Sequence, residues 1–167
     1  MLSSGKQEHR SGSSGLRIVE SRTLNEHRPT WDHLAEQAPE PTHSVASWWL
    51  NAADSTDPLY LLFLADGQLV GGIPFERETW RGLPRFRLLG YDMWPTDVDI
   101  VAEPSYYTAV VEGIGRWFRS KYDYLVDLRG LTAISLLPSR MPPGIGNRQV
   151  APTWTAPLGS DFSDYLG

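Results

Sequence analysis

The sequence predicts an α/β fold in which a mixed, partly antiparallel sheet is flanked by helices. A continuous apolar run over residues 59–64 is followed by Asp66-Gly67, a favoured hairpin turn, and by a second strand-like segment over 68–75. Apolar residues then recur at helical spacing over 107–118. The 13 prolines and 15 glycines interrupt the chain too often for a bundle of long helices. Strands and short helices must therefore alternate.

The chain divides into three parts. Residues 1–15 combine serine, glycine and charge with little apolar surface, which predicts a disordered tail. Residues 16–159 are long enough to form one domain around one core. Residues 160–167 resemble the first turn of an amphipathic helix. We expect this truncated helix to lead into a further lobe.

The first half of the domain should contain three elements before the hairpin. Apolar residues over 16–19 indicate a short strand. Thr30 is a suitable N-cap for a helix ending at Gln37, because its hydroxyl can accept from free amides. A second helix is expected over 44–53. Its apolar residues at i, i+3, i+4 and i+7 predict a buried face that contains Val45, Trp48, Trp49 and Ala52.

The second half should continue with strands and helices in alternation. Residues 85–89 predict a strand in which Arg85 and Arg87 face solvent while Phe86 and Leu88 face the core. Pro104 suits the first turn of a helix that runs to about residue 120. A strand over 122–128, a short helix over 131–137 and a strand over 148–155 follow.

Composition excludes several classes of function. The net charge of -5, from 15 basic and 20 acidic residues, is unsuited to neutralising phosphates, so no nucleic-acid partner is expected. The absence of cysteine excludes disulfides and thiol catalysis and fits a cytoplasmic location. No apolar run approaches the roughly 20 residues that span a bilayer. The four histidines lack metal-ligand spacing, so no metal site is expected.

A loop over residues 90–100 carries the strongest candidates for chemistry. It places carboxylates and aromatic rings between a strand and the next element, where a rigid scaffold can present them. Asp97 or Asp99 can orient or deprotonate an amine, with Tyr91 and Trp94 as apolar walls. The alternative is structural: Asp92 and Asp97 satisfy turn amides while Trp94 packs in the core.

A second candidate lies at the end of the strand over 122–128. Asp127 and Arg129 occur near its carboxyl end, where open α/β sheets place ligands. The alternative is a solvated strand edge. The usual catalytic signatures, such as Gly-x-Ser-x-Gly, His-Glu-x-x-His and the Walker loop, are absent from the sequence.

Several segments together resemble the GNAT-like, FemAB-related acetyltransferases, which include proteins associated with cellulose biosynthesis. The resemblance covers roughly residues 28–166 and depends on the order of loose, hydrophobic motifs. The matching segments are Trp31-x-x-Leu34, Trp48-Trp49, the strand pair over 59–75 with Asp66-Gly67-Gln68-Leu69-Val70-Gly71-Gly72-Ile73-Pro74, Leu88-Leu89-Gly90, Thr96-Asp97-Val98-Asp99-Ile100-Val101, Tyr124-Leu125-Val126-Asp127-Leu128, Ala156-Pro157-Leu158 and Tyr165-Leu166.

The resemblance implies that the chain is the N-terminal lobe of a GNAT-like acyltransferase. The implied reaction transfers an acyl group from acyl-CoA to an amine or hydroxyl. Acetyl is the expected acyl group. In that family a Gln/Arg-x-x-Gly-x-Gly/Ala loop in a later βα unit holds the pyrophosphate of the acyl-CoA. This sequence has no such loop; Gly144-Ile145-Gly146-Asn147 is its nearest approach, but it precedes a predicted strand. Acetyl-CoA is therefore implied for the full-length enzyme, with no cofactor site in this chain.

The expected partners follow from this assignment. A missing C-terminal lobe, or self-association in its place, should cover apolar surface along residues 154–166, and a small-molecule acceptor completes the reaction. The candidate residues for chemistry are Asp97 and Asp99, and those for acceptor binding are Tyr91, Trp94, Asp127 and Arg129. The alternative function is a non-catalytic accessory domain that uses the same fold to bind a partner or ligand.

Overall fold

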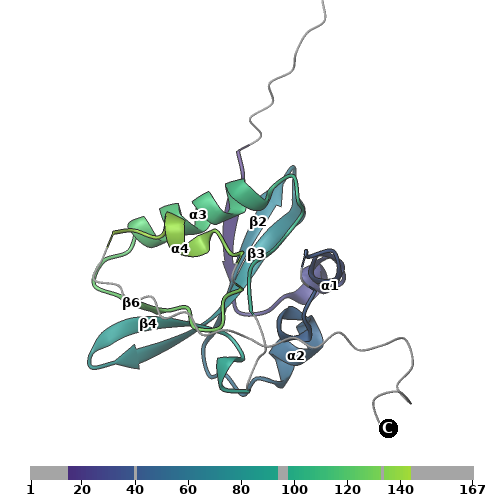
Figure 1. Ribbon diagram of the computed structural model, residues 1–167. Helices are drawn as coiled ribbons and strands as arrows, with labels where there is room; N and C mark the ends of the chain where they lie inside the picture. Colours follow the sequence, from purple (N-terminus) through teal and green to yellow (C-terminus); the bar gives the residue numbers. More distant parts are fainter. Residues whose placement is uncertain (1–14, 40, 94–97, 133, 144–167) are drawn as a thin grey trace, which may run out of the picture.

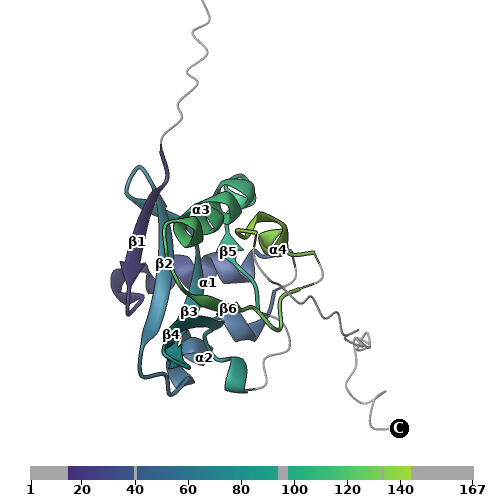
Figure 2. The same ribbon diagram turned by 90° about the vertical axis from the view of Figure 1, so that its left-hand side faces the viewer.

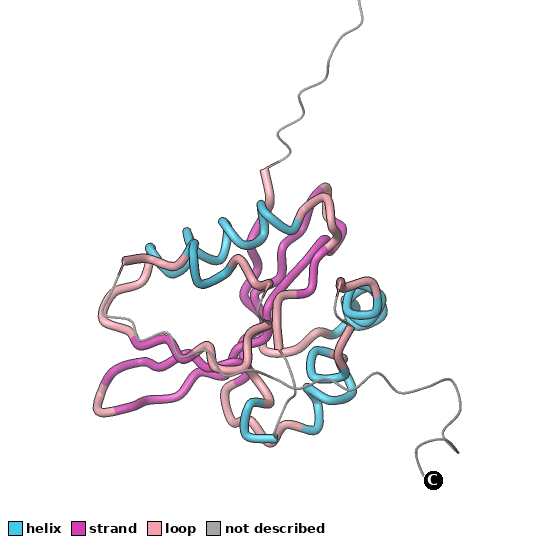
Figure 3. Tube along the Cα trace, viewed as in Figure 1, coloured by secondary structure: helices cyan, strands magenta, loops and turns pink. Residues whose placement is uncertain are grey.

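The chain folds as a mixed sheet with helices on both faces (Figure 1). The structure is a computed structural model that describes residues 15–39, 41–93, 98–132 and 134–143. Figure 3 colours the elements by type. In chain order they are β1 (Arg17–Ser21), α1 (Arg28–Glu36), α2 (Ser47–Ala52), β2 (Pro58–Ala65), β3 (Gln68–Trp80), β4 (Leu83–Leu88), β5 (Val101–Ala102), α3 (Tyr107–Arg119), β6 (Leu125–Asp127) and α4 (Leu137–Arg140), with short 3-10 turns at Asn25–His27, His43–Val45 and Tyr91–Met93.

Within the described residues, six strands form one sheet in the order β1-β2-β3-β4-β6, and β5 pairs with β3. The pairs β1–β2, β2–β3, β3–β4 and β3–β5 are antiparallel, whereas β4 and β6 are parallel. A parallel pair requires a crossover, which α3 supplies. The predicted α/β class with a mixed, partly antiparallel sheet is confirmed.

The β2–β3 hairpin forms as its sequence predicts. Asp66 and Gly67 have φ angles of 50° and 82°, the left-handed conformation that a tight two-residue turn requires. Every residue of β2 after Pro58 is buried, because helices cover both faces of this strand. The strand is therefore continuously apolar rather than alternating.

Two adjacent glycines in β3 show which helix covers which face. A Cβ on Gly71 would lie 2.8 Å from Val110 of α3, and a Cβ on Gly72 would lie 2.6 Å from the ring of Trp31 in α1. Successive residues of a strand point to opposite faces. Helices α1 and α3 therefore pack on opposite faces of the sheet (Figure 2).

Helix α1 is joined to α2 and to the 3-10 turn before it by three buried or half-buried hydrogen bonds. The Trp31 indole nitrogen donates to the Val45 carbonyl at 2.7 Å. The Asp32 carboxylate accepts from the backbone amide of Ser47 at 2.7 Å and from its hydroxyl at 2.6 Å. Asp32 thus accepts from a free amide in the first turn of α2. The N-cap residue of that helix, Ala46, has no side-chain acceptor for this amide.

Helix α3 fills the core with aromatic side chains. Phe118 is fully buried and lies 5.5 Å, centre to centre, from both Phe75 and Phe86. Two glycines allow the helix to approach its neighbours closely. A Cβ on Gly113 would lie 2.3 Å from the Phe63 ring, and one on Gly115 would lie 2.3 Å from the Arg140 carbonyl oxygen.

The predictions for the first two helices are wrong in detail. Helix α1 begins at Arg28, because Pro29 is well suited to a first turn, so Thr30 is not its N-cap. The segment predicted as one helix over 44–53 is a 3-10 turn followed by α2. Extended Ala46 separates the two and breaks the helical register between Val45 and Trp48. Trp48 is consequently 61% exposed and is not a core residue.

Later boundaries also differ from those predicted. The strand β3 continues to Trp80, five residues beyond its predicted end, because a second tight turn at Arg81-Gly82 extends the hairpin with β4. The helix predicted over 131–137 instead starts at Leu137, where a proline occupies its first turn. The disordered tail predicted over 1–15 lies outside the described residues except for Gly15. The strand predicted over 148–155 and the terminal helix predicted over 160–167 lie wholly outside them.

The described ranges also bear on membrane and metal sites. No helix there has the length and apolar character needed to cross a membrane. In the same ranges, no group of three or more histidine, aspartate or glutamate residues is arranged to hold a metal ion.

Candidate functional site

Charged residues gather where β4 and β6 end. Because these strands are parallel, their carboxyl ends meet at one edge of the sheet. Tyr91 and Asp92 follow β4, while Asp127 ends β6 and Arg129 comes two residues later. Asp92, Asp127 and Arg129 form a network with four residues of the β3–β4 hairpin. We call it the arginine–carboxylate cluster, and its members are Glu76, Glu78, Arg85, Arg87, Asp92, Asp127 and Arg129.

Asp127 holds two guanidinium groups. Its carboxylate accepts from Arg129 Nε at 2.8 Å and from Arg129 Nη2 at 2.7 Å, and it also accepts from Arg85 Nη2. Burial raises the pKa of Asp127, but the hydrogen bonds from Arg129 and Arg85 outweigh it, so the pKa lies below its ordinary value. The carboxylate therefore stays ionised and fully engaged, which suits a positioning residue and not a general base.

Arg129 lies over the ring of Tyr91. Its guanidinium carbon is 4.6 Å from the ring centre, within the range of a cation–π contact. The hydrogen bond with Asp127 raises the pKa of Arg129. The Arg129 side chain remains 57% exposed. One face of Tyr91 is thus covered by a guanidinium group, and its role as an apolar wall for an acceptor stays a prediction.

Arg87 is the most enclosed member of the cluster, with 14% of its side chain exposed. Its Nη2 atom lies 2.8 Å from both Glu76 Oε2 and Asp92 Oδ2. Burial lowers the pKa of Arg87, yet the hydrogen bonds to Asp92 and Glu76 raise it above its ordinary value. Arg85 pairs with Glu78 at 2.9 Å. The prediction that Arg85 and Arg87 face solvent is therefore wrong, because paired carboxylates enclose them.

Asp99 lies in a separate group of hydroxyls. Its Oδ2 accepts from the Thr132 hydroxyl at 2.6 Å, and its Oδ1 accepts from the Ser135 hydroxyl at 2.9 Å and from the Ile100 amide at 2.7 Å. Burial, followed by the charge of Asp99, raises the pKa of nearby Tyr107. This carboxylate joins the segment before α3 to the loop before α4.

The structure thus brings together three of the predicted residues, Tyr91, Asp127 and Arg129. Asp99 lies in the hydroxyl group described above, while Asp97 and Trp94 fall outside the described residues. The five other members of the cluster were missed, although the sequence carried a signal for four of them. A two-residue turn at Arg81-Gly82 pairs Glu78 with Arg85 and Glu76 with Arg87. The hairpin register alone therefore predicts these ion pairs.

The segment that enters α3 does not fit the pyrophosphate of an acyl-CoA. Its backbone groups already form hydrogen bonds with the sheet. Val101 and Ala102 pair with β3, and the Glu103 amide donates to the Val70 carbonyl at 3.0 Å. Glu103 adds a negative charge beside the helix start, and Pro104 has no amide hydrogen to offer. The near-candidate loop over 144–147 lies outside the described residues.

Comparison with known proteins finds similarity to solved structures alone. No protein-family model matches the chain, and no curated protein matches it. An aminoglycoside acetyltransferase from an uncultured soil metagenomic sample is similar at 16% identity, over 87% of this chain and 99% of that one, with a TM-score of 0.49. A second such enzyme, in complex with sisomicin, has 13% identity over 86% and 97% of the two chains and a TM-score of 0.49.

A ribosomal-protein-alanine N-acetyltransferase from Brucella melitensis is similar at 13% identity, over 83% of this chain and 100% of that one, with a TM-score of 0.46. At these identities and TM-scores the likeness assigns no activity, substrate or cofactor to the chain.

Proposed function

We propose that the chain is a lobe of a GNAT-like acyltransferase of the FemAB-related type, in which a second lobe binds acetyl-CoA. The enzyme would move an acetyl group to an amine or hydroxyl of a small molecule in the cytoplasm. Support comes from the order of motifs along the sequence and from the mixed sheet that the described residues form.

One observation supports a donor site in a different lobe. In the described ranges, the parallel unit β4–α3–β6 has a strand-to-helix connection at the carboxyl edge of the sheet, where a phosphate could bind. That connection, residues 89–106, holds four acidic residues, Asp92, Asp97, Asp99 and Glu103, and a single glycine, Gly90. Negative charge and a scarcity of glycine oppose pyrophosphate binding, so the donor site belongs elsewhere.

The arginine–carboxylate cluster suits the acceptor side of such an enzyme. Asp127 fixes Arg129 above Tyr91 at the carboxyl edge of the sheet, which leaves a partly exposed guanidinium to orient a polar acceptor. We include Asp97, Asp99 and Trp94 in the proposed acceptor region because they belong to the connection that follows β4.

Calorimetric titration of the purified chain with acetyl-CoA tests the location of the donor site. The expected result is no saturable heat. The Glu103→Gln variant serves as the matched control. It removes one negative charge from the connection over residues 89–106 and leaves the sheet pairing in place. A saturable isotherm for the unchanged chain would contradict a donor site in another lobe.

Transfer itself is tested by reconstitution. If a neighbouring reading frame encodes the glycine loop, adding its product to this chain should release CoA thiol from acetyl-CoA in the presence of amine or hydroxyl acceptors. Neither protein alone should do so. Thiol release that does not depend on this chain would exclude it from the reaction.

A non-catalytic accessory domain is the second candidate function. The mutual pairing of charges within the arginine–carboxylate cluster favours it, because paired groups hold a shape without reacting. Under this alternative no neighbouring frame carries the glycine loop, and the chain binds a partner or ligand without turnover.

A further inference from the structure

Trp48, near the start of α2, is the most exposed tryptophan among the residues that the structure describes. It belongs to a group of three rings, His43, Trp48 and Trp49, which we call the aromatic corner. The planes of His43 and Trp48 lie within 22° of parallel with their centres 6.3 Å apart, and Trp49 stands at 74° and 87° to them. Because 61% of Trp48 is exposed beside these two rings, a solute can reach its indole.

The backbone that carries the aromatic corner is fixed by helix α1, which lies beside α2 in Figure 1. Between His43 and Trp48, the Val45 carbonyl accepts from the Trp31 indole at 2.7 Å. The Ser47 amide and hydroxyl both donate to Asp32. The rings are therefore held in place before a ligand arrives, so binding has little ordering cost.

Other accessible rings of the molecule carry a cation of the chain itself. Arg81 lies 4.4 Å from the centre of the Trp80 ring, and Arg129 lies 4.6 Å from that of Tyr91. Trp48 has no such cation among the described residues. The negative face of its π system is thus open to a cation from outside the chain.

The residues around the aromatic corner are acidic. Residues 29–56, which span nearly all of α1 and the whole of α2, contain no lysine or arginine, and their acidic residues are Asp32, Glu36, Glu40 and Asp54. The Asp32 carboxylate lies at the Ser47 amide, one residue from Trp48, and within the described ranges it has no ion-pair partner. Nearby negative charge adds to the attraction that an aromatic face has for cations.

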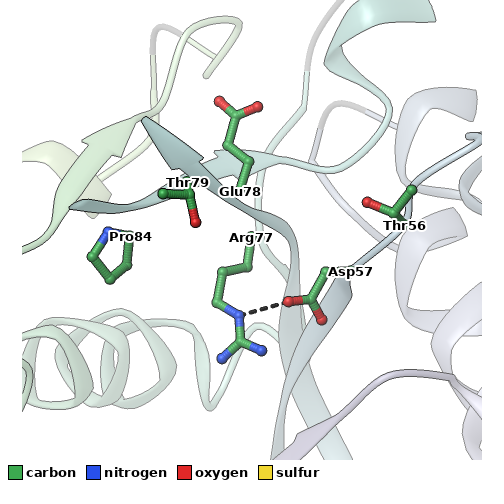
Figure 4. A pocket seen from close by; sticks show the side chains of 6 residues that line it. All are labelled: Thr56, Asp57, Arg77, Glu78, Thr79 and Pro84. Carbon is green, nitrogen blue, oxygen red and sulfur yellow. Dashed lines mark hydrogen bonds and ion pairs between the residues drawn. The ribbon is translucent and has the colours of Figure 1, made fainter. Parts of the chain in front are cut away.

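The arginines that flank this stretch in the sequence are engaged elsewhere. Arg28, the first residue of α1, lies near Tyr60: burial raises the pKa of Tyr60 to about 12, and the charge of Arg28 opposes that rise. Arg77 is bound to Asp57 at 2.7 Å across the concave surface of Figure 4. Neither guanidinium group is placed over Trp48.

The aromatic corner adjoins the arginine–carboxylate cluster. A Cβ on Gly90 would lie 3.3 Å from Trp49 Nε1, and Gly90 directly precedes Tyr91. The cluster adds no net positive charge, because its three arginines are paired with four carboxylates. Charge on both sides of the three rings therefore favours a cationic ligand over a neutral or anionic one.

We propose that the aromatic corner binds a small organic cation, whose alkylated ammonium group rests on the ring of Trp48. Alkyl groups on nitrogen pack against the rings while the positive charge meets the π face. A bare ammonium is more strongly hydrated, so it gains less at an exposed site. With a single open tryptophan as its main contact, the site should have a dissociation constant of roughly 1–10 mM. The inference is independent of the proposed acyl transfer, because binding involves no turnover.

The test titrates the full chain with choline and with 3,3-dimethylbutan-1-ol, which has the same shape and no charge. Saturation-transfer difference on the ligand methyl groups measures binding, and the indole N–H resonance of Trp48 reports its place. Choline should bind saturably and shift this resonance, and the uncharged analogue should bind about three- to tenfold more weakly. Added sodium chloride should weaken choline binding and leave the analogue unchanged, because salt screens charge.

Variants locate the site on one ring. Trp48→Leu changes an exposed side chain, so the chain should stay folded by circular dichroism and lose choline binding by roughly tenfold. Trp48→Phe should keep part of the affinity, because phenylalanine has the weaker π face. Trp80→Leu is the matched control: Trp80 is also exposed, but Arg81 already covers its ring, so choline binding should not change.

Four results would overturn the proposal. The first is the absence of a saturable signal from choline, and the second is equal affinity for choline and its uncharged analogue. The third is an equal loss of binding in Trp48→Leu and Trp80→Leu. The fourth is a capped trimethyllysine tripeptide that binds far more tightly than choline, because the ligand would then be a side chain of a partner protein.

Discussion

Glu20 and Trp117 are 97 residues apart in the sequence, yet the indole nitrogen of Trp117 donates to Glu20 Oε1 at 2.7 Å. The contact joins the edge strand β1 to the end of α3. Lys121 lies on the same side, with its Nζ atom 3.2 Å from Glu20 Oε1 and 4.4 Å from the centre of the Trp117 ring. Trp117 itself is only 7% exposed.

Replacing Glu20 should separate the hydrogen bond from the ion pair. Glu20→Ala leaves a buried indole N–H without its acceptor, so we expect a loss of ~1 kcal/mol and a melting temperature roughly 2–4 °C lower. Glu20→Gln keeps an oxygen for the indole and removes only a half-exposed charge, so its melting temperature should barely change. Equal effects of the two changes in thermal denaturation would contradict a dominant role for the indole contact.

Asp127 should make stability depend on pH. Its pKa in the folded chain is depressed, so its contribution is complete above the unfolded value of about 4 and is lost as the pH falls through the lower folded value. Asp127→Asn should cost roughly 1–3 kcal/mol near neutral pH. The difference from the unchanged chain should shrink below about pH 4, as measured by urea denaturation at several pH values.

The control for this experiment is Glu112→Gln. Glu112 and Arg116 form an exposed pair on α3 with atoms 4.0 Å apart, which should contribute less than about 0.5 kcal/mol. A difference between Asp127→Asn and the unchanged chain that stayed constant down to pH 2.5 would mean that the carboxylate is not held by its arginines.

Asp99 and Thr132 should be energetically coupled. The Thr132 hydroxyl is 2.6 Å from Asp99 Oδ2, and Thr132 is 8% exposed. We expect Asp99→Ala and Thr132→Val to interact by about 1 kcal/mol in a double-mutant cycle, because each removes one side of the same hydrogen bond. Additive losses in chemical denaturation would show that the loop before α4 does not depend on this contact.

Alanine at Gly113 should destabilise the chain although it favours a helix. The new Cβ would lie 2.3 Å from the Phe63 ring, and relieving such overpacking costs roughly 1–3 kcal/mol against about 1 kcal/mol of propensity gained. Thr108→Ala, at an exposed position of α3, is the control and should be neutral or stabilising. A Gly113→Ala chain at least as stable as the control variant would show that Phe63 can move aside.

The sequence predicts the elements with strong local signals and misses those defined by contacts. The β2–β3 hairpin can be predicted from the sequence, because its signals, an apolar run and an Asp66-Gly67 turn, each lie within a few consecutive residues. Strand β5 has only two residues, Val101 and Ala102, and exists because β3 offers them an edge. Trp48 was misplaced for a related reason: the extended conformation of Ala46 breaks a periodicity that appears continuous in the sequence.

The same distinction applies to the candidate site. Asp127 and Arg129 were predictable from their place at the end of a strand, whereas Asp92 joins the cluster through Arg87, a contact that no spacing rule supplies. The roles predicted for Asp97 and Asp99 in chemistry, and for the other candidates in acceptor binding, stay predictions.

The order of strands has a consequence for synthesis on the ribosome. Apart from β5, neighbours in the sheet follow one another along the chain, so β1 to β4 can pair while α3 and β6 have still to be made. Strand β6 can join only after the crossover helix has been completed. Until then β4 presents an unpaired edge, and its alternating arginines, Arg85 and Arg87, are the kind of charge that discourages a nascent strand from pairing with the wrong chain.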